Sequence, residues 1–276
     1  MRQFDEGLNL RKRHPFGRGW LMLNKLQSVV AIASLPNDLD VTYGDSGGQK
    51  LDIFPGPKAG SPVFIFIHGG YFRALDKSQY RYIAGRMNRL GYTTVLVNYD
   101  LAPAVPASEI IQQVFRSFQW ITQNIHKWHG DAAHLHLCGH SVGALLAAKI
   151  LELTGTSEIG DDGVIKSALL LSGIYDLKSL QQSYLNEDLH LSDDDVRNLS
   201  ADASLIKSST DILVAVGGKE TGEFIRQSEC YVRQLSEHAS APTFLQLEGI
   251  NHYSMSRLLT RRRSPILRWL VDVTQK

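Results

Sequence analysis

The sequence is poor in the features that mark disulfide-stabilised, membrane-spanning and metal-binding proteins. Two of its 276 residues are cysteine, Cys138 and Cys230, and two thiols cannot form a disulfide framework. No apolar run reaches the roughly 18 residues of a membrane span. Metal-ligand spacings, a P-loop and a Gly-x-Gly-x-x-Gly motif are all missing. We therefore expect a protein of the reducing cytoplasm that uses no metal and no other cofactor.

Charge of a single sign is also lacking. The chain has 29 Lys and Arg against 28 Asp and Glu, for a formal charge of +1. Binding to nucleic acid or to an anionic membrane is favoured by a large positive balance, which this composition does not supply. We therefore expect a small-molecule partner, no nucleic acid and no membrane. A homodimer stays open, because composition does not bear on it.

The first 35 residues contain a basic run followed by an apolar one. Arg11-Lys12-Arg13 precedes the apolar segment 20–35, a pattern that export signals share. Four polar residues between positions 24 and 28 interrupt this segment, whereas the core of an export signal is continuous. We expect residues 1–35 to form an amphipathic helical segment packed on the domain, with an export signal as the alternative.

From residue 36 onward, apolar strand-like runs alternate with segments of helical periodicity. Continuous apolar runs are typical of parallel strands that are buried on both faces. The expected strands are 40–43, 50–54, 63–67, 94–97, 135–138, 168–171, 212–216 and 244–247, and the expected helices are 78–90, 107–123, 142–153, 222–238 and 255–273. This order predicts a single α/β domain over 36–276, with an eight-stranded, mostly parallel sheet and helices on both faces. The polar segment 177–210 precedes the penultimate strand, where we expect a small lid-like insertion.

One strand is joined to its helix by Gly-His-Ser-Val-Gly at 139–143. Because Gly139 and Gly143 have no Cβ, strand and helix can approach closely and hold Ser141 in a strained turn above the sheet. This context is that of a nucleophile elbow. The pattern predicts that Ser141 is a catalytic nucleophile. The alternative is an ordinary turn in which the serine caps the helix.

A serine nucleophile needs a base, and the base needs a carboxylate that orients it. His252 follows the last expected strand, at the sheet edge where the parallel strands end. Glu220 follows the penultimate strand and is the expected acid, with Asp176, after the strand before it, as the rival. The chain order serine, acid, histidine is that of α/β-hydrolases. The sequence therefore predicts an α/β-hydrolase fold whose catalytic residues are Ser141, Glu220 and His252.

His-Gly-Gly-Tyr-Phe at 68–72 follows a buried strand and is similar to a glycine-rich oxyanion loop. Backbone N–H groups that point at the substrate oxygen stabilise the charge that develops on it. The expected donors are the N–H groups of Gly69, Gly70 and Val142. Three aromatic residues beside these groups are expected to bind the substrate and to limit the size of its acyl group: Tyr71, Phe72 and Tyr253.

Several blocks between residues 40 and 255 resemble the kynurenine formamidase (arylformamidase) branch of the α/β-hydrolases. The more specific blocks are Tyr-Asp-Leu-Ala-Pro at 99–103 and Glu-Phe-x-Arg-Gln-Ser at 223–228. In that family the triad acid stands just before the second block, which implies Glu220 as the acid and a structural role for Asp176. The family usually has Asp where Glu220 stands, often Trp where Phe72 stands and often Phe where Tyr253 stands.

The function that these residues predict is that of a serine hydrolase. It would cleave a small carboxylic ester or an aryl formamide through an acyl-enzyme, without a cofactor. The resemblance implies a true N-formylkynurenine formamidase as an alternative. A further alternative is a catalytically silent hydrolase fold that binds a ligand, because a fold alone does not establish activity.

Overall fold

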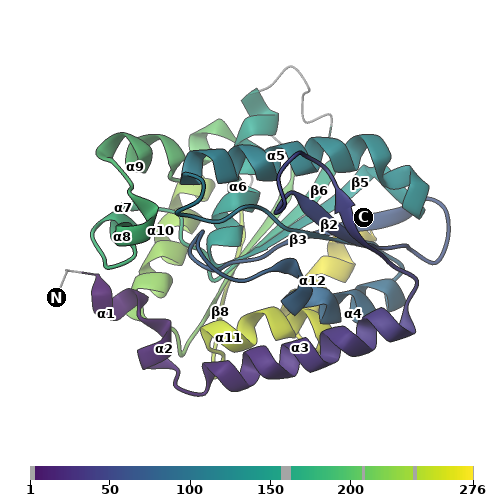
Figure 1. Ribbon diagram of the computed structural model, residues 1–276, viewed down its shortest axis with the longest axis horizontal. Coiled ribbons are helices and arrows are strands. Elements are labelled where there is room, and N and C mark those ends of the chain that lie inside the picture. Colours follow the sequence, from purple (N-terminus) through teal and green to yellow (C-terminus); the bar gives the residue numbers. More distant parts are fainter. Residues whose placement is uncertain (1–3, 157–162, 207–208, 239–240, 276) are drawn as a thin grey trace.

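A twisted eight-stranded sheet lies at the centre of the molecule (Figure 1). The computed structural model describes residues 4–156, 163–206, 209–238 and 241–275. The strands are β1 Asp38–Thr42, β2 Lys50–Phe54, β3 Ser61–Ile67, β4 Thr93–Val97, β5 Gly130–His140, β6 Ile165–Leu171, β7 Asp211–Gly217 and β8 Thr243–Leu247. Each expected strand corresponds to one of these, which confirms the predicted α/β architecture.

The strand order across the sheet is β1-β2-β4-β3-β5-β6-β7-β8. The pairs β1 with β2 and β2 with β4 are antiparallel, and all the other pairs are parallel. The strands from β3 to β8 therefore end at one edge of the sheet. In such sheets the loops at the carboxyl edge form the ligand site, and the loops that carry the expected site residues all leave from this edge.

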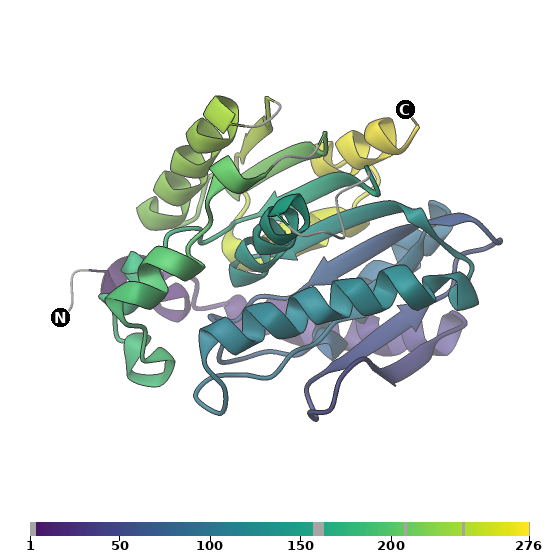
Figure 2. The same cartoon turned by 90° about the horizontal axis from the view of Figure 1, so that it is seen from above.

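Helices cover both faces of the sheet (Figures 1 and 2). Alternate residues of β3 point to opposite faces, so Ile65 belongs to one hydrophobic core and Phe66 to the other. The first core includes α5 Ala107–Asn124, α6 Val142–Thr156 and α10 Gly222–His238. The second includes η1 Lys77–Ile83, α4 Ala84–Arg89, η4 Ser256–Thr260 and α12 Pro265–Thr274. A short helix, η2 Ile125–Trp128, follows α5.

The prediction of one continuous helix over 255–273 is wrong. The structure has α11 His252–Met255, then η4, and then α12, which begins at Pro265. Proline lacks a backbone N–H and its ring clashes inside a helix, but it is favourable at the first position of a new one. The hydroxyl of Ser264 caps this new helix by accepting a hydrogen bond from the Leu267 N–H at 3.2 Å.

The polar segment between β6 and β7 forms several short helices instead of one long loop. They are α7 Lys178–Gln181, α8 Asn186–Leu189, α9 Asp193–Leu199 and η3 Ala203–Leu205; residues 207–208 lie outside the described residues. Helix α9 begins with a capping box, in which Ser192 and Asp195 satisfy each other's backbone N–H groups.

The N-terminal helical segment is divided into three helices. It contains α1 Asp5–Leu8, α2 Leu10–Arg13 and α3 Gly17–Ser34. Helix α3 places the small or polar residues Asn24, Ser28 and Ala31 toward the domain, where they are buried, and leaves larger apolar residues outside. Small side chains allow α3 to lie close to η1, which explains why its apolar side is not the buried one.

Besides His252, three histidines are buried in the body of the domain. Burial lowers the pKa of His136 to about 3, and it also lowers the pKa of His68 and, strongly, that of His140. All three are therefore neutral in the folded protein at neutral pH. Since the unfolded chain binds protons on these groups with a pKa near 6.5, it gains more protons than the folded chain as the pH falls.

The free energy of unfolding is accordingly expected to decrease as the pH falls below about 6.5, before most carboxylates titrate. Each buried histidine contributes a slope of up to about 1.4 kcal/mol per pH unit. Urea unfolding of His136→Gln between about pH 6.5 and about pH 5 should show a slope that is shallower by about one proton. His126→Gln, at an exposed position, is the control; equal slopes in both variants would contradict the prediction.

Candidate active site

Ser141 sits at the sharp turn between β5 and α6. It is buried, and its φ of +61° lies in the left-handed region that L-residues seldom adopt. A Cβ on Gly139 would lie 2.0 Å from the carbonyl oxygen of Gly143, and one on Gly143 would lie 2.2 Å from that of Ile67. Only glycine fits at both positions, so the turn can be held in this strained form.

His252 and Glu220 form a buried pair at the end of the neighbouring strands. The Nδ1 atom of His252 lies 2.7 Å from Oε2 of Glu220, and both side chains are almost completely excluded from solvent. The other carboxylate oxygen accepts hydrogen bonds from the Ser172 hydroxyl at 2.5 Å and from the Gly217 N–H at 3.0 Å. Because an ionised carboxylate only accepts, Nδ1 carries the proton, and the lone pair of His252 is on Nε2.

The two loops that carry this pair are joined by backbone hydrogen bonds. The Lys219 N–H donates to the carbonyl oxygen of Ile250 at 2.9 Å, and the Gly218 N–H donates to that of Leu247 at 2.8 Å. Asn251 caps α11, so His252 is the first residue of that helix. The short turn after β7 and the cap after β8 thus hold the carboxylate and the imidazole in contact.

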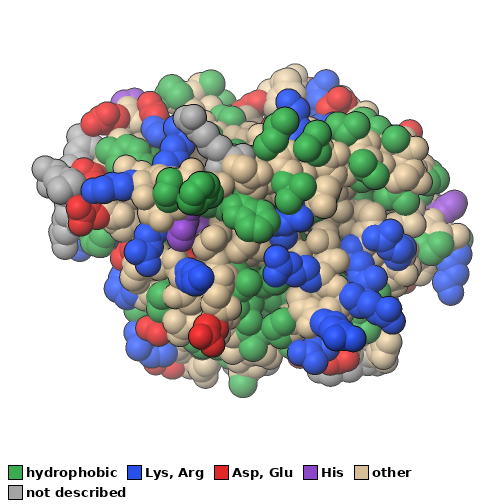
Figure 3. Space-filling model, turned by 90° about the horizontal axis from the view of Figure 1, so that it is seen from below, with side chains coloured by type: hydrophobic (Ala, Val, Ile, Leu, Met, Phe, Trp, Pro, Cys, Tyr) green, Lys and Arg blue, Asp and Glu red, His purple; other side chains and the backbone are tan. Residues whose placement is uncertain are grey.

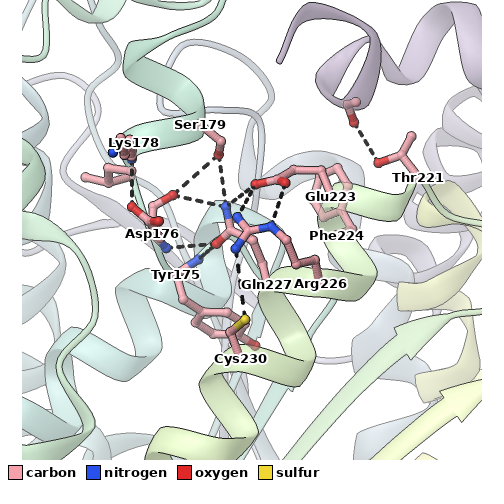
Figure 4. A network of polar contacts seen from close by, with 12 residues as sticks. Tyr175, Asp176, Lys178, Ser179, Thr221, Glu223, Phe224, Arg226, Gln227 and Cys230 are labelled. Carbon is pink, nitrogen blue, oxygen red and sulfur yellow. Dashed lines mark hydrogen bonds and ion pairs between the residues drawn. The ribbon is translucent and has the colours of Figure 1, made fainter. Parts of the chain in front are cut away.

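Asp176, the rival acid, lies elsewhere. Its side chain is exposed and accepts a hydrogen bond from the Lys178 N–H at 2.9 Å. Gln227 holds the surrounding loop by hydrogen bonds (Figure 4). Its Oε1 accepts hydrogen bonds from the N–H groups of Tyr175 and Asp176, and its Nε2 donates one to the Asp176 carbonyl oxygen at 3.0 Å. The Glu-Phe-x-Arg-Gln-Ser block therefore serves a structural purpose in this chain, because its glutamine fixes the loop after β6.

The glycine loop after β3 lies against Ser141. A Cβ on Gly69 would lie 2.7 Å from the Cβ of Ser141, and Gly70 has a φ of +117° with the Ala74 carbonyl oxygen 1.9 Å from the position of its Cβ. Glycine is thus required at both positions. Val142 is the first residue of α6, and the first N–H groups of a helix have no partner within the helix. This arrangement can present backbone donors next to Ser141.

His68 orders this loop and is not a second base. It is fully buried, with Nδ1 2.8 Å from the Gly69 carbonyl oxygen and Nε2 3.1 Å from Oδ1 of Asn98. The ring of Tyr99 stacks on it with 4.3 Å between centroids, and the Tyr99 hydroxyl donates to the His68 carbonyl oxygen at 2.7 Å. Tyr99 opens the Tyr-Asp-Leu-Ala-Pro block, so this block also supports the loop.

A pocket of about 320 Å³ opens onto Ser141 and His252, near the lower end of the range of about 300–1,000 Å³ for small-molecule sites. Tyr71 and Tyr253 line it, as expected, together with Tyr80 and Tyr184. No acidic residue is among the residues that line it. The pocket can accommodate a compact substrate with aromatic or apolar character.

The expectation that Phe72 lines the pocket is wrong. Phe72 is fully buried in the first hydrophobic core, and its carbonyl oxygen accepts a hydrogen bond from the Ala102 N–H at 2.9 Å. Tyr71 and Phe72 have φ values of +53° and +60°, a tight turn in which successive side chains point in different directions. Tyr71 consequently faces the pocket, while Phe72 faces the core.

A large part of the pocket wall comes from the N-terminal segment, which the sequence did not predict. Residues of this segment that line the pocket are Leu8, Asn9, Leu10, Arg11, Leu21 and Asn24. The Thr221 hydroxyl donates to the Gly7 carbonyl oxygen at 2.6 Å, and the Tyr71 hydroxyl donates to that of Leu8 at 2.9 Å. The expected insertion 177–210 contributes Tyr184 only. The sequence carried no motif for this wall.

Two histidines next to the Glu220–His252 pair were also missed. His140, inside the elbow motif, lies with its Nε2 3.0 Å from the His252 carbonyl oxygen and its ring 4.6 Å from that of His252. The carbonyl can only accept, so Nε2 of His140 carries the proton and holds the His252 backbone. His14 packs edge-on against Tyr253, and burial lowers its pKa. Their contacts join positions far apart in sequence, which no local pattern reveals.

Among the described residues, no group of three or more His, Cys, Asp and Glu side chains could hold a metal ion. Across the described chain no helix is long and apolar enough to cross a membrane.

Comparisons with known proteins agree with this geometry. Residues 64–256 match a family model described as the alpha/beta hydrolase fold. The kynurenine formamidase of Danio rerio is 32% identical over 246 residues, which cover 86% of this chain and 82% of that protein. The kynurenine formamidase of Salmo salar is 36% identical over 226 residues, covering 79% and 75%. A solved structure from Silicibacter, described as a candidate thioesterase, aligns over 100% of both chains with a TM-score of 0.83 and 23% identity, which shows the fold alone.

Proposed function

Because the chain belongs to the α/β-hydrolase fold family, in its kynurenine formamidase-like branch, we propose that this hydrolase works through an acyl-enzyme on Ser141. Its substrates are small carboxylic esters or aryl formamides. The observation that carries the proposal is the buried Glu220–His252 pair beside a serine held at positive φ. A structural serine or a solvated histidine would need neither arrangement.

In the first step, Nε2 of His252 takes the hydroxyl proton of Ser141 while Oγ attacks the carbonyl carbon of the substrate. Glu220 keeps the imidazole in the required orientation and stabilises the positive charge that it acquires. The Ser172 and Gly217 donors hold the carboxylate in place. His140 acts as a positioning residue, through the His252 carbonyl oxygen.

The N–H groups of Gly69, Gly70 and Val142 receive the negative charge that forms on the carbonyl oxygen; one such donor contributes about 10² to 10³ in rate. His252 then gives its proton to the leaving alcohol or amine. Water enters, His252 removes its proton, and the same donors stabilise the second tetrahedral intermediate. Every proton that leaves Ser141 or water is returned to a product or to the serine.

The enzyme is expected to prefer short acyl groups, formyl to butyryl, on aromatic leaving groups. The pocket is small, and Tyr71 and Tyr253 supply rings against which an aromatic group can stack. Values of kcat/KM along a p-nitrophenyl ester series from acetate to palmitate test this expectation. A maximum at chains of about eight carbons or longer would show that the pocket extends beyond the volume seen here.

A second candidate is N-formylkynurenine formamidase activity, which is favoured by the names of the two fish relatives. Hydrolysis of N-formylkynurenine and of p-nitrophenyl acetate by one preparation separates the two candidates. A formamidase should have a kcat/KM for N-formylkynurenine that exceeds its value for the ester. A general esterase should show the reverse.

We also propose a cytoplasmic location. Both cysteines are free thiols, and Cys138 is buried in the central strand β5. A protein that has no stabilising disulfide between its cysteines suits a reducing compartment. Fractionation of the cells that make the protein, followed by an activity assay of each fraction, tests this proposal.

A further inference from the structure

The outer side of α3 exposes an unusual number of large apolar side chains. Seven such side chains in the described residues are at least 37% exposed, and six of them lie between positions 16 and 30. These six, which we call the α3 stripe, are Phe16 (85%), Met22 (58%), Leu23 (37%), Leu26 (53%), Val29 (59%) and Val30 (64%). The seventh is Leu205 at 37%. Scattered exposed apolar residues are ordinary, whereas a contiguous group indicates an interaction site.

The orientation of α3 is fixed by polar contacts on its inner side. The Arg257 guanidinium donates to Oδ1 of Asn24 at 2.6 Å and lies 5.3 Å from the ring centroid of Trp20. The hydroxyl of Ser28 accepts a hydrogen bond from the Tyr82 N–H at 3.2 Å. Rotating the helix to bury the α3 stripe would break both hydrogen bonds, so the stripe is a permanent surface of the folded enzyme.

A longer segment that contains α3 also concentrates positive charge. Residues 7–37 contain five Lys and Arg and no Asp or Glu, which leaves 24 basic and 28 acidic residues in the rest of the chain. The formal charge of +1 is therefore the sum of +5 on this segment and −4 elsewhere. Figure 3 shows that hydrophobic side chains and many Lys and Arg side chains share the underside of the molecule. Lys12, Arg13 and Lys25 are exposed.

We propose that the enzyme docks on the surface of an anionic lipid bilayer through the α3 stripe. An apolar helix face with flanking cations binds in the headgroup region, where the apolar side chains leave water and the cations meet anionic lipids. Each cation near such a surface contributes modestly, and the contributions add. The expectation of no membrane partner came from the net charge, which averages over faces. Docking of this kind is peripheral and needs no spanning helix.

A second copy of the chain fits the stripe less well. The 18 residues of α3 span about 27 Å, so a contact about 10 Å wide would bury roughly 270 Å² per partner. Stable interfaces bury about 800 Å² per partner. Two-fold pairing of α3 would also bring together two helices that each contain two basic and no acidic residues, which costs energy at low salt. Charge complementarity favours the bilayer.

Docking by α3 would place the active site next to the lipid. Leu21 and Asn24, on the inner side of α3, line the pocket that contains Ser141. Leu21 also lines a groove between α3 and η1 with Met22 and Lys25. The pocket is thus separated from the bilayer by about one helix diameter, near 10 Å.

The test is flotation of the full chain with vesicles of phosphatidylcholine alone or with about 30% phosphatidylserine. We expect binding to the anionic vesicles only, weakened by salt at about 0.5 M because screening shortens to a few ångströms. Leu26→Gln with Val30→Gln should weaken binding about tenfold or more. Lys12→Gln with Lys25→Gln should weaken it several-fold. Leu205→Gln, the matched control at an exposed apolar site outside the stripe, should bind like the wild type.

None of the four substituted residues lines the pocket, so hydrolysis of p-nitrophenyl acetate should be unchanged in both variants. This activity also serves as the control that each variant is folded. Absence of binding to anionic vesicles, or equal binding by the stripe variant and the Leu205→Gln control, would overturn the proposal. A wild-type dimer in light scattering that becomes a monomer in the stripe variant would also overturn it, because the stripe would then be an interface between copies.

Discussion

Replacement of Ser141 with alanine is expected to reduce kcat/KM for p-nitrophenyl acetate by about 10⁴-fold or more. The hydroxyl is the proposed nucleophile, and neither the oxyanion donors nor His252 can replace the covalent step. The fold should be kept, because the change removes one oxygen at the end of β5. Residual hydrolysis should be comparable to that of His252→Ala, since the two residues act as one unit.

A fluorophosphonate that labels Ser141 in the wild type, located by peptide mass, provides an independent measurement. The matched control is Ser46→Ala in the β1–β2 loop, far from the pocket in sequence and contacting Gln49; it should keep full activity and full labelling. More than a few per cent of wild-type kcat in Ser141→Ala, or a label on another residue, would exclude the proposed mechanism. A catalytically silent fold would take no label in the wild type.

Replacement of Glu220 with glutamine is expected to lower kcat by roughly 10⁴-fold with little change in KM, as loss of a triad carboxylate does in other hydrolases. The amide keeps the shape but removes the charge that stabilises the imidazolium. It also presents an N–H₂ group to Nδ1 or to Ser172, which favours the wrong tautomer of His252. Kinetics across pH measure this electrostatic effect. Circular dichroism detects any loss of folding.

Asp176→Asn is the matched control, because Asp176 is the rival acid, which follows β6, the strand before β7. Its side chain caps the Lys178 N–H in an exposed loop, so the change should cost about 1 kcal/mol of stability or less and leave kcat unchanged. Loss of activity only in Asp176→Asn would show that the wrong strand end had been assigned.

The sheet and the position of the Glu220–His252 pair were predictable because local patterns encode them. Apolar runs such as 63–67 are typical of strands that are buried on both faces, and glycine at 139 and 143 is required by the close approach that the structure shows. Glu220 and His252 each follow a strand directly. In a parallel sheet this local fact determines a spatial one, since the strands share their carboxyl edge.

Much of the pocket wall was not predictable from the sequence because it depends on contacts between distant segments. Phe72 and Tyr71 are equally aromatic, and only the backbone turn decides which of them faces the core. The apolar residues of α3 suggested that its apolar side would pack on the domain. Asn24 and Ser28 lie on the inner side instead, where they form hydrogen bonds with Arg257 and Tyr82. Such pairings leave no periodic signal in either segment.

The packing of the N-terminal segment against the last quarter of the chain bears on synthesis by the ribosome. Purple and yellow elements lie side by side in Figure 1, and the bond between Asn24 and Arg257 joins positions 233 residues apart. Translation adds about 5 to 20 residues per second, so Arg257 is synthesised roughly 10 to 50 seconds after Asn24. Strands β3 to β5 and the elbow can meet much earlier. The nascent chain can therefore form the turn that holds Ser141 before the pocket is complete. The first helices to be synthesised are among the last to pack.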